Sequence, residues 1–148
     1  MKIVDIQPYD NFDVKFRLVI CKTRKEMVRV YKKYRPKEND QEMDAIFSTM
    51  DYLTKDNLPG EFKSNIFGTM FLNLETLSDP IITHECGHAA FSFERNIRRY
   101  TGNFDCDKNN GEFFPNGGGD EQEVFCYFLE NAFIKVKQAI KRYAQAPQ

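Results

Sequence analysis

The amino-acid sequence predicts a small α+β fold, in which a mixed or antiparallel sheet packs on three helices. Two apolar segments, 12–20 and 66–72, have the patterns of strands, the first alternating and the second continuous. Three further segments, near 23–35, 80–99 and 120–143, carry helix start signals or apolar side chains at helical spacing. With 148 residues the chain is long enough to bury a hydrophobic core, which should be rich in Phe because the chain has fourteen Phe and no Trp.

The composition is that of an ordinary globular domain, with 41% hydrophobic and 29% charged residues and a net charge of −1. This balance gives no global attraction to nucleic acid or anionic lipid, so neither is an expected partner. The chain has no apolar run of membrane-spanning length and no signal-peptide pattern, which predicts a cytoplasmic protein. Its four cysteines show no close pairing motif and are expected to be reduced thiols. We expect one domain over residues 1–148, with a loose tail at about 144–148.

The first strand and the first helix are predicted from local patterns. Thr23 as N-cap and Glu26 three residues later open an amphipathic helix, which Pro36 stops. The outer face of this helix is basic, which suits a solvated surface or contact with a phosphate backbone; the acidic segment that follows favours the solvated surface. The alternating strand before it places one set of apolar side chains on the core: Phe12, Val14, Phe16, Leu18 and Ile20.

Two more strands are expected in the middle of the chain. Residues 45–53 form the second strand, which ends near a turn signal. Residues 66–72 form a buried strand directly before the next helix, and Gly68 in it marks a bulge or a close backbone approach.

The last two helices follow from their start signals. Ser78 as N-cap and Pro80 in the first turn begin a helix that runs to about residue 99. A polar, glycine-rich loop spans 101–119, and Asp120 then caps a helix that runs to about residue 143.

Both histidines of the chain lie in one short motif, His84-Glu85-Cys86-Gly87-His88. On a helix, positions i and i+4 share a face, so the two imidazoles can point at one metal ion. Glu85 is rotated by about 100° from His84, which places its carboxylate beside the ion rather than on it. This is the donor set of a hydrolytic zinc site, in which zinc acidifies a water molecule and the glutamate takes its proton.

Such a site needs a third protein ligand, which must be a carboxylate or a thiolate because no third histidine exists. Glu123, on the last helix, is the first candidate and Glu121 is the second. Glu123 is equally suited to a capping box with Asp120, so its role stays open on spacing alone. Two other interpretations compete: two exposed histidines without metal, and a structural site closed by Cys106 or Cys126.

At this point the chain resembles the HExxH zinc metallopeptidases of the gluzincin type, particularly the small phage-encoded members and the ImmA/IrrE-like peptidases. The motif at 84–88, followed by Ala89 and Ala90, matches their first motif. Glu123-Val124-Phe125-Cys126 is similar to their second motif, with Cys126 in the place of the usual Ala. The resemblance covers mainly residues 66–134.

The resemblance implies a minimal zincin-like domain that holds Zn²⁺ through His84, His88 and Glu123. It implies hydrolysis of a protein or peptide substrate, with Glu85 as general base, in the host cytoplasm if the protein is phage-encoded. It also implies that strand 66–72 is the sheet edge with which an extended substrate pairs. Tyr127 either donates a hydrogen bond to the oxyanion or packs on the core. The alternative function is a metal-binding modulator that acts by binding a partner protein.

Overall fold

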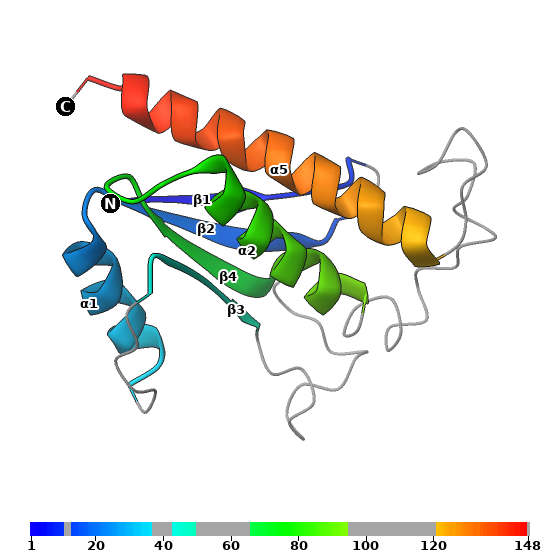
Figure 1. Cartoon of the computed structure of the whole chain (residues 1–148), viewed down its shortest axis with the longest axis horizontal. Coiled ribbons are helices and arrows are strands. Elements are labelled where there is room, and N and C mark those ends of the chain that lie inside the picture. The colour runs from blue at the N-terminus through cyan, green and yellow to red at the C-terminus, as the bar shows by residue number, and fades with distance from the viewer. Residues whose placement is uncertain (11–12, 37–42, 50–65, 95–120, 148) are drawn as a thin grey trace.

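The structure, a computed structural model, describes residues 1–10, 13–36, 43–49, 66–94 and 121–147; of Thr49 and residues 121–124 it describes only the backbone. Figure 1 shows a twisted sheet with α2 and α5 lying side by side across it and α1 apart from them. The elements in chain order are β1 (Lys2–Ile6), β2 (Lys15–Cys21), α1 (Arg24–Tyr34), β3 (Ala45–Thr49), β4 (Ile66–Asn73), α2 (Asp79–Ser92) and α5 (Glu121–Gln145).

The four strands form one mixed sheet in the order β1-β2-β4-β3. β1 pairs with β2 antiparallel, β2 with β4 parallel, and β4 with β3 antiparallel. The predicted α+β fold with a small mixed sheet is confirmed. The expectation that strand 66–72 lies at the sheet edge is wrong, because Ala45–Thr49 pairs along β4 and takes the edge position itself.

The two faces of the sheet carry separate cores. The main core lies between the sheet and helices α2 and α5, and the smaller one lies under α1. The alternation of β2 explains this division, since successive side chains of a strand point to opposite faces. Phe16, Leu18 and Ile20 enter the main core, as predicted, whereas Val19 and Cys21 enter the second.

Gly68 lies at an irregularity between β2 and β4. Lys15 pairs with Ile66 and Arg17 with Thr69, so β4 has one residue more than β2 between these pairs. A Cβ at Gly68 would collide with the Phe47 ring and lie 2.9 Å from the Ser48 carbonyl oxygen. The predicted bulge and close approach are both present, and they seat Phe47 of β3 against the core.

Several predicted boundaries need correction. The strand β1 was not predicted, although its sequence KIVDI has the β-branched residues of a strand. β2 begins at Lys15 rather than at residue 12, and α5 continues to Gln145, so residues 144–145 belong to the helix and not to a tail. The predicted ends of two elements, 50–53 and 95–99, lie outside the described residues, as do Phe12, the predicted loop 101–119 and the predicted cap Asp120.

The first helix begins as predicted. Thr23 accepts a hydrogen bond from the Glu26 backbone N–H at 3.2 Å, and Glu26 accepts one from the Lys22 N–H at 2.8 Å. Met27 and Tyr31 are buried on the inner side. Among the described residues, no helix is both long and apolar enough to span a bilayer.

Candidate metal centre

The motif lies in the middle of α2, which its N-terminal signals begin where predicted. The Ser78 side chain accepts a hydrogen bond from the Ile81 N–H at 3.4 Å, and Pro80 lies in the first turn. The inner side of α2 enters the main core through residues that include Ile82, Cys86 and Ala90. His84 and His88 each lie two residues from such a position, which turns them about 160° away from the core.

The two imidazoles face each other on the exposed side of α2. Their Nε2 atoms are 3.0 Å apart and the rings lie nearly perpendicular, with 4.7 Å between their centroids. Two nitrogens bound to one tetrahedral zinc at the usual bond length are about 3.3 Å apart. The pair therefore needs only a small adjustment to bind one zinc ion, and both side chains are exposed to receive it.

Glu85 differs from both histidines because it is buried, with 6% of its surface exposed. Burial raises the pKa of its carboxyl above the usual range, while His88, His84 and a hydrogen bond from the Phe47 backbone act in the opposite direction. The Phe47 contact ties the carboxyl to edge strand β3. A buried carboxyl with a raised pKa beside two imidazoles is suited to accept and return a proton.

The beginning of β3 is fixed beside α2 by polar contacts that the sequence did not reveal. Asn73 is fully buried at the end of β4 and donates to the Asp44 carbonyl oxygen at 2.7 Å; it also accepts from the Thr76 N–H at 3.0 Å. Arg24 donates to the Met43 carbonyl oxygen at 2.9 Å. These bonds hold residues 43–45 next to the first turns of α2. A polar residue at the end of an apolar strand is the only local signal for Asn73.

A groove opens between β3 and α2 at the His84 end of the pair. One wall comes from the start of β3 and the other from the first two turns of α2. The residues lining it are Met43, Asp44, Ala45, Pro80, Ile81, His84 and Glu85.

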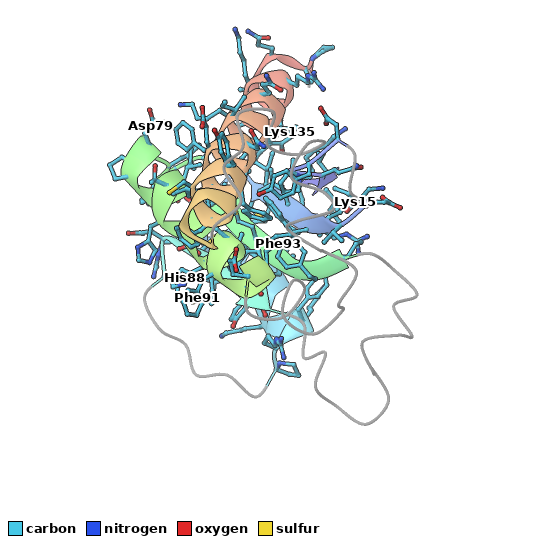
Figure 2. The ribbon with its side chains drawn as sticks, turned by 90° about the vertical axis from the view of Figure 1, so that its right-hand side faces the viewer. Lys15, Asp79, His88, Phe91, Phe93 and Lys135 are labelled. Atoms are coloured by element: carbon cyan, nitrogen blue, oxygen red, sulfur yellow. The ribbon has the colours of Figure 1, made fainter. Side chains whose placement is uncertain are left out.

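Helix α5 packs against α2 on a side away from the two imidazoles. Phe93 stacks on Phe128 with ring centroids 4.8 Å apart, and Lys137 forms an ion pair with Asp79 at 2.5 Å. The two helices are therefore antiparallel. Figure 2 shows His88 on the side of α2 turned away from α5, whereas Phe93 points inward.

The remaining candidate residues are distributed as follows. Glu121 and Glu123 lie in the first turn of α5, and their side chains are outside the description. Tyr127 packs half-buried against the main core. Cys86 is buried and Cys126 is exposed; Cys106 lies outside the described residues. Within the described part of the chain, no three His, Cys, Asp or Glu side chains gather closely enough to hold a metal ion.

Comparisons with protein-family models, with curated proteins and with solved structures gave no match to this chain. The resemblance to the gluzincins therefore rests on the residues of the motif. The fold and the local geometry of α2 and β3 were observed in the structure and do not depend on this resemblance.

Proposed function

We propose that this protein is a zinc-dependent metallopeptidase with its active site on the exposed side of α2. One observation carries the proposal: His84 and His88 point their Nε2 atoms at each other, 3.0 Å apart, next to the buried carboxyl of Glu85. Two imidazoles are two of the three protein ligands that a hydrolytic zinc site uses.

In this proposal each residue of the motif has a separate task. When bound, zinc supplies a Lewis acid that makes water acidic enough to react near neutral pH. His84 and His88 hold the ion. Glu85 takes the proton of the attacking water and returns it to the leaving amine, and the Phe47 N–H keeps its carboxyl in place.

Glu123 remains the proposed third ligand and Glu121 the second choice. Because α5 packs on the far side of α2 from the imidazoles, a ligand from its first turn has to approach around the carboxyl end of α2. Tyr127 keeps its proposed role at the oxyanion, with core packing as the alternative that its half-buried position favours.

The edge strand that pairs with an extended substrate is, in this proposal, β3 rather than β4. Its outer side faces α2, since the Phe47 backbone bonds to Glu85 there. The groove beside Ala45 leads from the strand to His84. A peptide strand added to β3 would bond to its outward main-chain groups other than the Phe47 N–H, which Glu85 already occupies, and would pass the two histidines.

The alternative function is a metal-binding protein that keeps the histidine pair but acts as a modulator by binding a partner. Glu85→Gln separates the two functions, because it removes the proton acceptor and leaves the imidazoles in place. For a peptidase we expect unchanged zinc content and a loss of peptide hydrolysis of about 100-fold or more. Zinc content is measured by atomic spectroscopy and hydrolysis with a degenerate peptide library.

Two controls make this test specific. Glu130→Gln changes an exposed glutamate of α5 and should retain both zinc and hydrolysis, whereas His84→Ala should lose both. The modulator function would be favoured over the peptidase function by two results together. Zinc-loaded wild-type protein would hydrolyse no peptide, and the Glu85→Gln protein would keep its full biological effect.

The identity of the third zinc ligand is tested by measuring zinc affinity, without any measurement of hydrolysis. Glu123→Gln should weaken zinc binding by at least about tenfold, since a catalytic site has only three protein ligands. Glu121→Gln serves as the matched substitution in the same helical turn and should leave the affinity unchanged. If only Glu121→Gln weakens binding, the second choice is the ligand; if neither does, the ligand comes from another segment.

A further inference from the structure

Phe91 is the most exposed of the large apolar side chains in the described residues. Its exposed fraction is 61%, against 46% for Ile134 and 50% for Tyr34. Burying an aromatic ring is among the largest apolar gains available to a side chain. Single exposed apolar side chains are common on protein surfaces, so the position of this ring relative to the histidines decides whether it can contact a ligand.

Phe91 lies on the same side of α2 as the two histidines. It follows His84 by seven residues and His88 by three, which is the i, i+4, i+7 spacing of one helical face. The axial distance from His88 is about 4.5 Å at the usual rise of a helix. Figure 2 shows His88 and Phe91 next to each other on the outer side of α2, with Phe93 on the opposite, inner side.

The contacts of β3 give the order of positions along this face. Ala45 lines the groove together with Ile81. Phe47, two residues further along β3, bonds through its backbone to Glu85, four residues further along α2. β3 and α2 therefore run in the same direction, as Figure 1 also shows. The groove lies at the His84 end of the pair, and Phe91 lies beyond His88.

We propose that Phe91 is a specificity-determining residue that binds an apolar side chain of the substrate on the amino-terminal side of the scissile bond. This inference rests on the proposed peptidase function. A peptide that pairs antiparallel to β3, the commoner strand pairing, runs from the Phe91 end of the site to the groove. Its amino-terminal half then passes the Phe91 ring, so Leu, Ile, Met or Phe is favoured there.

The cleavage experiment uses the zinc-loaded full chain and a degenerate decapeptide library, with the products sequenced by mass spectrometry. For wild type we expect Leu, Ile, Met and Phe to be enriched one or two residues before the cleaved bond. Phe91→Ser should remove this enrichment and lower kcat/KM for apolar peptides by about 10- to 200-fold, the range for apolar pocket contacts. Phe91→Leu should restore most of it, and Ile134→Ala, a change of another exposed apolar residue, should alter neither.

A binding experiment tests Phe91 independently of turnover. The same library is passed over immobilised, zinc-loaded Glu85→Gln protein, and retained peptides are identified. Peptides with large apolar residues should be enriched, and the added substitution Phe91→Ser should lower their enrichment at least threefold without changing zinc content.

The outcomes distinguish the two proposals. Enrichment that depends on Phe91 without any hydrolysis by wild type would overturn the peptidase and keep Phe91 as a peptide-binding residue. Hydrolysis whose sequence preference is the same in Phe91→Ser would overturn the role of Phe91 and keep the peptidase. Absence of peptide retention by the Glu85→Gln protein would also overturn the role of Phe91.

Discussion

Neighbouring residues in the motif have opposite environments, and their chemistry depends on this contrast. His84 and His88 are exposed, whereas Glu85 is 6% exposed and bonded to the Phe47 backbone. A rotation of about 100° per residue takes the chain from the open side of α2 to its contact with β3. The two imidazoles are therefore accessible from solvent, and the carboxyl is shielded from bulk water, as the proposed zinc site and its general base require.

The cysteines give a prediction at the same scale. Burial, followed by the charge of Glu26, raises the pKa of the Cys21 thiol to about 11. At pH 8 only about one part in a thousand of Cys21 is thiolate, and thiolate is the reactive form. Iodoacetamide at pH 8 should therefore modify the exposed Cys126 and spare Cys21, as read by peptide mapping.

The sign of the pH dependence follows from the direction of the shift. The Cys21 proton is held more tightly in the folded protein, so the thiol contributes stability below its unfolded pKa, and this contribution is lost as the pH rises toward 11. Labelling of Cys21 in native protein should increase steeply between pH 9 and 11. Rapid labelling of Cys21 at pH 8 in fully folded protein would contradict its burial.

At the scale of elements, the position of β3 decides the candidate site. Asn73 and Arg24 anchor the start of the strand, and Gly68 gives room for the Phe47 ring. As a result, the edge of the sheet passes close to Glu85. The motif helix alone would expose two histidines. With β3 beside it, the same helix also borders a groove and the edge strand of the sheet.

Two glycine substitutions should have opposite effects. Gly68→Ala should destabilise the protein by about 1–3 kcal/mol, because the added Cβ meets the Phe47 ring and the Ser48 carbonyl. Gly87→Ala meets nothing within 4 Å and should stabilise it by about 0.5–1 kcal/mol, since alanine is the better helix former. Urea unfolding measures both; equal effects of the two substitutions would contradict the packing of β3 on Gly68.

At the scale of the whole molecule, one sheet is shared by two cores. Helices α2 and α5 cover one face and α1 the other. The last helix closes the fold by joining distant parts of the chain: Lys135 bonds to Asp10 at 2.6 Å and Lys137 to Asp79 at 2.5 Å. Because the cores share β2 and β4, we expect the domain to unfold in one cooperative step.

Phe128 tests how α5 is held. It is fully buried and packs against Tyr9, Phe67 and Phe93. Phe128→Ala should lower the free energy of unfolding by about 3–5 kcal/mol. Ile134→Ala, on the exposed side of the same helix, should change it by less than about 0.5 kcal/mol. Transitions followed by circular dichroism and by tyrosine fluorescence should coincide; separate transitions would show that α5 unfolds independently of the sheet.

Features that depend on neighbouring residues were predictable from local patterns. The caps at Thr23 and Ser78, the alternation of β2 and the shared face of His84 and His88 all follow from local geometry, so they could be read from spacing. The irregularity at Gly68 was predicted for the same reason. β1 was missed because five residues of strand pattern carry a weak signal without their partner strand.

The identity of the edge strand and the covered side of α2 could not be predicted in this way. Both depend on pairing between segments far apart in the chain, such as β3 with β4 and Phe93 with Phe128. Which of these contacts form depends on the total apolar area that the sheet and the helices bury together. No short sequence pattern encodes that area. The motif thus specifies a pair of imidazoles on one face of a helix. The packing of β3 beside α2 forms the groove next to His84, and the packing of α5 buries another side of α2 in the main core.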